Sequence, residues 1–347
     1  MEEASEPFRK SEEPHAVLLD VGHGNAAIFI DGDVAIVVDA GSGDLVTDTL
    51  ERLGVREIAA LVISHRHHDH TSELPALLSN RELQIRRLFV NADPSRDPSS
   101  RFETLLRGAI NDSWKRNRTE LDQANVTLSE QMNTQHLEVE VLWPGVEIAM
   151  TGVGAATTTD GTVHPHAMAV VLRVARREGR SVLLGADLDY AGFRQLIDDP
   201  DTDLSADVLV YPHHGGLAGA GSAAGEQQFA TDLAQAVTPE LVVFSNGRGR
   251  HDNPRPEVVR GIRQARDSPK IRLVCTQLSR QCSPDAFADD GRLDTTLGSA
   301  GGVKGLSCSG SIRVALAGPG PLLPFGHRHI DFVVNKVGES ALCIGHH

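Results

Sequence analysis

Short apolar runs, separated by turn-forming residues, are the most regular feature of this sequence. Three of them follow one another near the N-terminus, at 16–19, 26–30 and 34–38. The stretches between them, 22–25 and 31–33, are rich in Gly, Asn and Asp, which are typical of tight turns. The pattern therefore predicts three consecutive antiparallel strands.

Further apolar runs recur along the chain, and segments with helical spacing lie between them. We expect strands at 61–64, 87–90, 136–143, 168–174, 208–211, 241–244, 274–277 and 309–314, and one that begins at Ser181. We expect helices at 44–53, from Thr71 or Ser72 to Leu78, and at 226–236. Strands that alternate with helices predict an α/β (α+β) chain.

The polar stretches set the expected domain boundaries. Residues 1–14 are charged and lack the apolar stretch of a secretory signal, so we expect a disordered leader. We expect one domain at 15–316, with a helical insertion at 91–135 and a Cys-containing insertion at 279–307. A C-terminal extension at 317–347 follows and contains a strand-like run at 329–337. No apolar run approaches the roughly 20 residues that span a bilayer, so a cytoplasmic protein without membrane contact is the simplest expectation.

The stretch from Leu61 to His70, LVISHRHHDH, joins one of these strands to a cluster of metal-capable side chains. His65 and His67 lie two apart, so in an extended turn they project to the same side and can share one ion. Asp69 and His70 fall on the next turn and could hold a second ion nearby. The H-x-H-x-D-H spacing therefore predicts a two-metal loop at the end of a strand.

This hexapeptide after a buried strand resembles the metallo-β-lactamase superfamily. The motif D-V-G-x-G-(D/N)-(A/S) at 20–26, followed by V-D-A-G at 38–41, is similar to the ComEC-type subgroup. That subgroup is the metallo-hydrolase domain of bacterial competence DNA-uptake channels, and it also occurs in soluble stand-alone proteins. The resemblance implies an αββα sandwich, in which helices flank two mixed β-sheets. The family's final strand pair would correspond to 274–277 and 309–314. It also implies that Asp39 orients the metal loop without binding metal, while Asn25 departs from the Asp usual in this group.

Later segments of the resemblance supply more candidate site residues. His166 matches the position of the third ligand of the first ion, with His164 as the alternative. Asp187 ends L-L-G-A-D, which is similar to the family's L-L-T-G-D, and would bridge the two ions. The H-H-G that follows the strand at 208–211 implies His213 as the last ligand of the second ion. His214 would then be a neighbouring acid or substrate contact, although the two histidines could be exchanged.

The resemblance thus implies a complete set of ligands and catalytic residues. The implied metal ligands are His65, His67 and His166 for the first ion, Asp69, His70 and His213 for the second, and Asp187 between them. The implied catalytic residues are Asp69, Asp187 and His214. Zinc is the default ion for such His-rich ligands, while manganese or iron also suits mixed His and carboxylate sites.

Two features leave alternatives open. The family's N-x-x-x-H-P appears here with Asn253-Pro254 in place of His-Pro, so His251 either compensates or has no such role. The four cysteines all lie in the last quarter of the chain. Buried thiols are favoured over a structural zinc set made of Cys282, Cys308, Cys343 and His346.

Charge narrows the range of substrates. The formal net charge of −14 argues against binding to an extended duplex, which needs many Lys and Arg. A small phosphorylated molecule or a short nucleic-acid strand remains compatible. The basic residues of the insertion either meet such a phosphate or form a solvated helical face; they are Arg101, Arg107, Lys115, Arg116 and Arg118.

We therefore expect a hydrolase in which two divalent ions activate a water. The link of ComEC-like relatives to DNA degradation implies phosphodiester hydrolysis in a nucleotide or short nucleic acid. An ester, lactone or thioester hydrolase is the enzymatic alternative and would need an apolar pocket. The other alternative is a metal-stabilised effector module of a bacterial, defence-like assembly, with a protein partner or a second copy of the chain.

Overall fold

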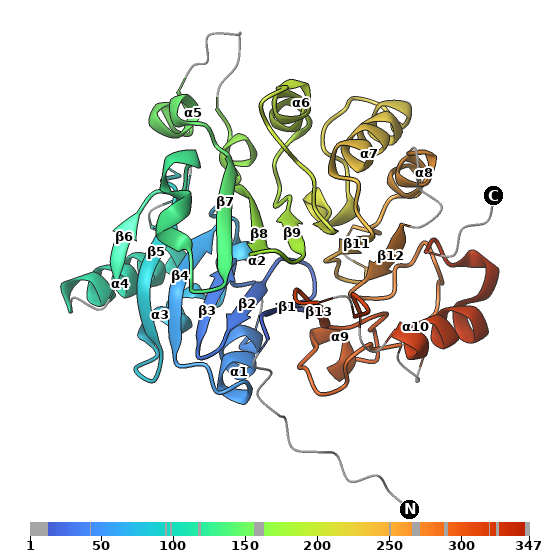
Figure 1. Ribbon diagram of the computed structural model, residues 1–347, viewed down its shortest axis with the longest axis horizontal. Coiled ribbons are helices and arrows are strands. Elements are labelled where there is room, and N and C mark those ends of the chain that lie inside the picture. The colour runs from blue at the N-terminus through green and yellow to red at the C-terminus, as the bar shows by residue number, and fades with distance from the viewer. Residues whose placement is uncertain are drawn as a thin grey trace, which may run out of the picture.

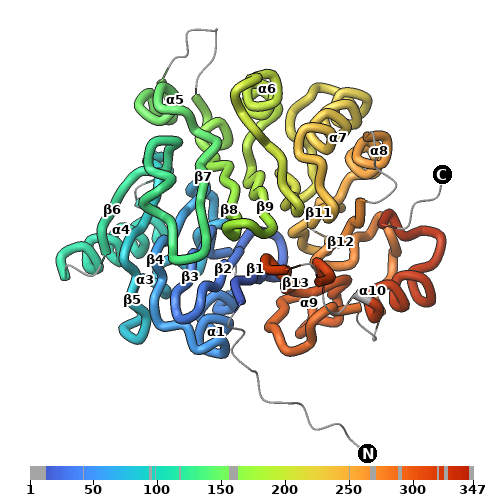
Figure 2. The backbone as a smooth tube through the Cα atoms, viewed as in Figure 1, coloured from blue at the N-terminus to red at the C-terminus, as the bar shows by residue number. Residues whose placement is uncertain are grey.

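Two β-sheets pack face to face between two layers of helices (Figure 1). The computed structural model describes residues 13–41, 43–93, 96–97, 99–116, 119–155, 163–249, 251–265, 271–287, 291–318, 320–323 and 326–343. The chain builds the first sheet and then the second, and a late strand returns to the first sheet, as the colours of Figure 2 show.

Within the described residues, the first sheet holds seven strands. In order across the sheet they are β13 (Ile312–Ala315), β1 (His15–Leu18), β2 (Ala27–Asp31), β3 (Val34–Val38), β4 (Glu57–Ile63), β5 (Gln84–Val90) and β6 (Glu120–Asp122). β1, β2 and β3 form the predicted antiparallel series. β4, β5 and β6 continue parallel to β3, which gives a mixed sheet.

The second sheet holds six strands in the part of the chain that the structure describes. In order they are β12 (Arg272–Cys275), β11 (Leu241–Phe244), β10 (Val208–Val210), β9 (Ser181–Leu184), β8 (Val171–Arg176) and β7 (Leu137–Trp143). β9 to β12 are parallel, whereas β8 is antiparallel to both of its neighbours. β7 lies at the edge, and buried and exposed residues alternate along its first half.

Helices cover the outer face of each sheet. α1 (Leu45–Arg52), α3 (Leu74–Ser79) and α4 (Arg101–Lys115) cover the first sheet, where Leu50 and Leu106 pack in one cluster with Leu61 of β4. α6 (Tyr190–Asp198), α7 (Ala223–Val237) and α8 (Pro256–Gln264) cover the second sheet, where Phe229 packs in one cluster with Leu209 of β10. Both outer layers are therefore held by apolar contacts.

A third apolar cluster fills the space between the sheets. Val62 of β4 joins it together with Val182 and Val243 from the second sheet. Its neighbour Leu61 faces the helices instead, because successive side chains of a strand point to opposite faces. A strand buried on both faces therefore has the continuous apolar sequence seen here. These layers form the predicted αββα sandwich.

Several predictions about the chain's later parts need correction. The run at 329–337 is helical, within α10 (Gly326–Phe332) and the π-helix Val333–Val337, because His329, Phe332 and Val333 share a buried face. The expected final pair is divided, since β12 lies in the second sheet and β13 pairs with β1 in the first.

The insertion at 91–135 holds α4, β6 and the 3-10 helix Val126–Met132, so it is only partly α-helical. The metal loop contains a short helix, α2 (His68–Thr71), before α3. Residues 1–12 of the expected leader lie outside the described residues. No helix among the described residues is long and apolar enough to cross a membrane.

Candidate metal centre

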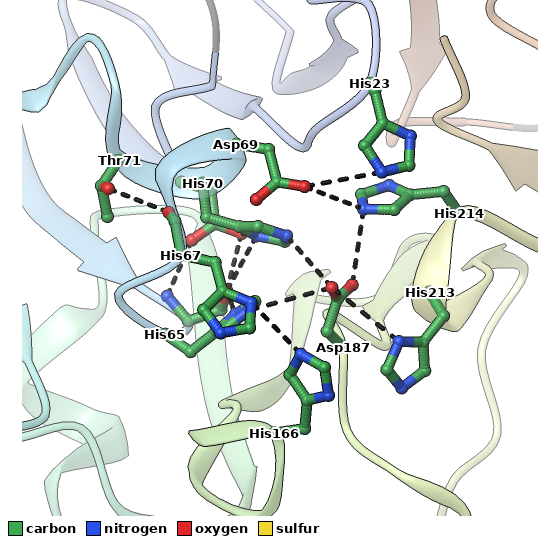
Figure 3. Close-up of polar contacts among 12 residues, drawn as sticks. His23, His65, His67, Asp69, His70, Thr71, His166, Asp187, His213 and His214 are labelled. Atoms are coloured by element: carbon green, nitrogen blue, oxygen red, sulfur yellow. Dashed lines mark hydrogen bonds and ion pairs between the residues drawn. The ribbon is translucent and has the colours of Figure 1, made fainter. Parts of the chain in front are cut away.

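Strand ends from both sheets meet at one edge of the sandwich, and the predicted metal-binding side chains lie there (Figure 3). β3 and β4 are parallel, so Asp39 and the loop 64–70 leave neighbouring strands at the same end. Asp187 and His214 follow the parallel pair β9 and β10 in the same way. β8 is antiparallel to β9, so the 3-10 helix Pro165–Met168 that precedes it brings His166 to this edge.

His65, His67, His166 and Asp187 form the first cluster, in which one donor atom from each lies within 4.8 Å of the others. Nδ1 of His67 lies 3.2 Å from Nε2 of His166. Nε2 of His65 lies 3.8 Å from Oδ2 of Asp187. Donors that bind one ion at roughly 2.1 Å lie about 3.4 Å apart in a tetrahedral site, so this cluster has the spacing for a divalent ion.

His164, the alternative to His166, lies elsewhere. Its side chain is 63% exposed, and its Nδ1 lies 3.5 Å from Oδ2 of Asp189. Asp189 itself caps α6 by accepting a hydrogen bond from the backbone N–H of Gly192, as expected of a residue at a helix start. His166 is therefore the histidine of this pair that joins the first cluster.

His70, Asp187 and His214 form the second cluster within the same limit. Nε2 of His70 lies 3.6 Å from one oxygen of Asp187, and Nε2 of His214 lies 3.6 Å from the other. Oδ2 of Asp69 lies 3.8 Å from Nε2 of His214. Asp187 is thus shared by both clusters, between the two places where ions are expected.

The structure places His214, where His213 was expected, at this second cluster. The two residues lie in the 3-10 segment Pro212–Gly215, where φ is 51° at His213 and 58° at His214. With this backbone conformation the two adjacent side chains leave the turn in different directions. Nδ1 of His213 lies 3.9 Å from Asp187, and its ring contacts that of His166, 4.9 Å between centroids. His213 therefore lies beside the first cluster.

Buried donor atoms of both clusters make no hydrogen bond within the described part of the chain. They are Nε2 of His65, His70 and His214, and Oδ1 of Asp187. Buried polar atoms left without partners cost free energy, and cations bound between them would satisfy all four. Nδ1 of His70 contacts Asp39, and Nδ1 of His214 donates to the Ser245 carbonyl, 2.9 Å away. Nε2 of each ring therefore faces the cluster. The residues present therefore fit two divalent ions.

Asp39 connects the metal loop to β3. Its carboxylate accepts hydrogen bonds from the backbone N–H of Ser64 at 2.7 Å and from its hydroxyl at 2.8 Å, and contacts Nδ1 of His70 at 2.7 Å. It is 2% exposed and adopts φ of 60°. These contacts agree with the expectation that Asp39 orients the loop.

Burial and neighbouring charges set the protonation states. Burial lowers the pKa of the imidazoles of His65, His166, His213 and His214, most strongly for His65. Although burial opposes ionisation of Asp187, the nearby His214 and His70 hold its pKa well below the usual range. Burial also opposes the charged form of His70, yet Asp39 and Asp187 raise its pKa well above the usual value. Neutral imidazoles beside an ionised carboxylate are the forms that bind cations, so His70 would release the proton on Nε2 when an ion binds there.

His23 is a member of this edge that the sequence analysis missed. It occupies the variable position of the motif at 20–26, so the motif did not mark it. Its Nε2 lies 3.6 Å from Oδ2 of Asp69, and its ring lies between those of His214 and His251, at centroid distances of 4.3 and 4.6 Å. The available signal was a histidine between two glycines in the turn that follows a strand.

The cysteines form no metal-binding group among the described residues, and His346 of the predicted zinc set lies outside them. Sγ of Cys308 instead lies 3.4 Å from Nε2 of His329. Burial raises the pKa of Cys275 and Cys308 well above the usual value, so both are neutral thiols. The favoured expectation of buried thiols is therefore confirmed for Cys275, Cys282 and Cys308, whereas Cys343 is partly exposed.

An open cavity of about 490 Å³ lies over the two clusters. Side chains of both clusters line it together with His251, Asn253 and Arg255, and Leu217 is its only aliphatic side chain among the described residues. Asn253 donates to the carbonyl of His213 at 3.3 Å, so it supports the H-H-G turn. The basic residues of the insertion that the structure describes do not line this cavity.

A family model of the metallo-beta-lactamase superfamily matches residues 19–245. The chain belongs to this superfamily. The matched region runs from the end of β1 to the end of β11 and includes every residue of the two clusters. The superfamily is one of metal-dependent hydrolases, and the sandwich described above is the metallo-β-lactamase fold.

Solved structures similar to this superfamily member are remote in sequence. The metallo-β-lactamase fold protein YhfI from Bacillus subtilis is 12% identical with a TM-score of 0.44, over 75% of this chain and 96% of that one. A diphosphatase from the PhnP family is 14% identical with a TM-score of 0.39, over 74% and 94%. The short form of human tRNase Z is 14% identical with a TM-score of 0.37, over 65% and 91%. No curated protein matches the chain.

Proposed function

We propose that this chain is a metal-dependent phosphodiesterase that acts on nucleotides or short nucleic acids. The observation that carries the proposal is the position of Asp187, which is shared by two donor clusters that open into one cavity lined largely by histidines. Paired cations on a shared carboxylate suit the hydrolysis of an anionic phosphodiester, because two positive charges meet the oxygens that carry developing negative charge.

The proposed ligands follow the geometry. His65, His67 and His166 hold the first ion, Asp69, His70 and His214 hold the second, and Asp187 lies between them. Divalent cations bound there would polarise a phosphoryl oxygen and lower the pKa of a water enough to supply hydroxide near neutral pH. Zinc is the ion we propose because imidazoles dominate the first cluster, and the mixed second cluster also suits manganese or iron.

The chain's own residues make the cavity suitable for an anion. Arg255 lines the cavity with a side chain that is 38% exposed, and its backbone N–H donates to the carbonyl of Gly215 at 2.8 Å, which fixes it beside the H-H-G turn. A guanidinium in this place can bind a phosphodiester oxygen with charge-assisted hydrogen bonds. The volume of the cavity suits a small ligand, and the net charge of −14 disfavours a long duplex.

The lining of the cavity favours this reaction over ester, lactone or thioester hydrolysis. Acyl chains need a pocket lined by apolar side chains, and among the described residues Leu217 is the one aliphatic side chain that lines this cavity. We also propose the ComEC-like subgroup, on the motif at 20–26 and the H-H-G turn, and a cytoplasmic location.

The test compares hydrolysis of bis-p-nitrophenyl phosphate and p-nitrophenyl butyrate by metal-loaded protein. We expect turnover of the diester, with KM raised about tenfold in Arg255→Ala, the size of effect that loss of one charge-assisted hydrogen bond gives. Arg260→Ala, on the exposed face of α8, is the matched control and should leave KM unchanged. Faster hydrolysis of the butyrate would contradict the proposal, and two bound ions without any turnover would favour the partner-module alternative.

A further inference from the structure

The loop that carries His23 is packed directly against the metal loop. Gly24, at φ of 143°, leaves no room for a side chain, since a Cβ there would lie 2.2 Å from the backbone oxygen of Asp69. A Cβ on Gly247 would lie 2.4 Å from the backbone nitrogen of His23. The hydroxyl of Ser245 donates to the carbonyl of Gly24 at 2.7 Å. His23 is therefore held in place by close backbone packing from two sides.

The ring of His23 is directed at donors of the second cluster, as Figure 3 shows. Its Nε2 lies 3.6 Å from Oδ2 of Asp69, and the same oxygen lies 3.8 Å from Nε2 of His214. One donor atom from each of the three residues lies within 4.8 Å of the other two. The side chain of His23 is only 10% exposed, so the surrounding protein holds its ring close to these donors.

His214 belongs to this group and also to the group with His70 and Asp187. Its Nδ1 donates to the carbonyl of Ser245, which can only accept, so Nε2 is the unprotonated nitrogen. A neutral imidazole nitrogen has one lone pair in the ring plane and binds one ion. The two groups that share His214 therefore cannot each hold a separate ion through it, and a single ion bound there would draw on donors from both groups.

We propose that His23 is an additional ligand of the second ion, contributed from the loop between β1 and β2. The second ion would then be surrounded by His23, Asp69, His70, Asp187 and His214. This set exceeds the four ligands of a tetrahedral zinc site and suits an ion that accepts five or six donors, such as manganese or iron. The inference rests on the metal centre of the proposed function, and its readout is metal binding, so it stands or falls apart from turnover.

The experiment measures metal binding to metal-free protein by calorimetric titration with Mn²⁺ and with Zn²⁺, and metal content after dialysis. In His23→Ala we expect the first ion to bind as in the unchanged protein. Loss of a residue that hydrogen-bonds to a metal ligand weakens metal binding by roughly 10- to 100-fold. Because His23 would bind the ion directly, the dissociation constant of the second ion should rise by at least that factor. We also expect a larger effect with Mn²⁺ than with Zn²⁺. His251→Ala removes the other ring that stacks on His23 and is the matched control, expected to leave both ions bound.

His23→Gln keeps much of the volume of the side chain and separates loss of the donor from loss of packing. Circular dichroism checks the fold of each variant, and weakened binding of the second ion in a folded His23→Gln supports the proposal even where the alanine variant fails to fold. The proposal would be overturned if His23→Gln bound the second ion as tightly as the protein without the substitution does. It would also be overturned if the protein without the substitution bound only one ion. If the His23 variants bind the second ion more weakly but the protein hydrolyses no diester, only the proposed function would be contradicted.

Discussion

Nδ1 of His70 lies 2.7 Å from Oδ2 of Asp39, a residue that follows the neighbouring strand of the sheet. This contact fixes the ring so that Nε2 faces the second cluster. We predict that Asp39→Asn raises the dissociation constant of the second ion by roughly 10- to 100-fold, because the neutral amide holds the ring less firmly. Calorimetric titration of metal-free protein measures the change.

A matched control exists in the same sheet. Oδ1 of Asp31 lies 2.7 Å from Nδ1 of His136, with the same type of contact, outside both clusters. Asp31→Asn should change stability but leave metal affinity as it is. Equal effects of the two substitutions on the second ion would mean that Asp39 acts through general stability and has no specific role at the metal centre.

The two adjacent histidines of the H-H-G turn give a second prediction. His214→Ala removes Nε2 from the second cluster, so this variant should retain the first ion and lose the second. His213→Ala should retain both, since no donor group among the described residues includes His213. Metal content after dialysis separates the two variants. Loss of the second ion in His213→Ala alone would restore the assignment made from sequence.

This pair also shows where sequence reasoning ends. The H-x-H-x-D-H spacing located the metal loop, because short spacing along an extended turn fixes which side chains can share an ion. The order of His213 and His214 depends on two successive residues with positive φ, which apolar patterning does not report. His23 was missed because its contact with Asp69 arises from packing between loops that are distant in the sequence.

The sequence predicted the fold best for strands whose two faces are both buried. Strands such as Leu241–Phe244 are buried on both faces, and their continuous apolar runs predicted them well. The tail around Phe332 was misread, since a short run rich in β-branched residues is compatible with strand or helix. Pairing of β13 with β1 could not be read from local patterning, because it joins the two ends of the domain.

A buried ion pair links the metal loop to α4 and gives a prediction on stability. Arg66 and Glu103 contact each other, with side chains 12% and 4% exposed. We predict that Glu103→Gln lowers the free energy of unfolding by about 3–5 kcal/mol, because it leaves the Arg66 charge buried without its partner. Urea denaturation measures the loss. The exposed pair of Arg86 and Glu57 is the control, and Arg86→Gln should cost less than about 1 kcal/mol.

His329 predicts a loss of stability in acid. Burial lowers its pKa to about 3, whereas the unfolded chain has the ordinary value near 6.5. Below pH 6.5 the unfolded state takes up a proton on this histidine and the folded state does not. The free energy of unfolding should therefore decrease as the pH is lowered from 6.5 to about 3. This group contributes at most about 1.4 kcal/mol per pH unit. His329→Gln should flatten this part of the profile measured by urea denaturation. The exposed His327→Gln should leave it unchanged, and equal slopes in both variants would contradict the assignment.

The most direct test follows hydrolysis of bis-p-nitrophenyl phosphate while metal-free protein is titrated with zinc or manganese, beside His67→Ala and Asp187→Ala. His67 belongs to the first cluster and Asp187 to both, so each variant should lower kcat by at least about 100-fold, the loss typical when a group that stabilises charge in the transition state is removed. Turnover that appears on metal loading and disappears in both variants is the predicted result. Fully loaded protein without turnover, or full activity in Asp187→Ala, would contradict a phosphodiesterase built on this shared carboxylate.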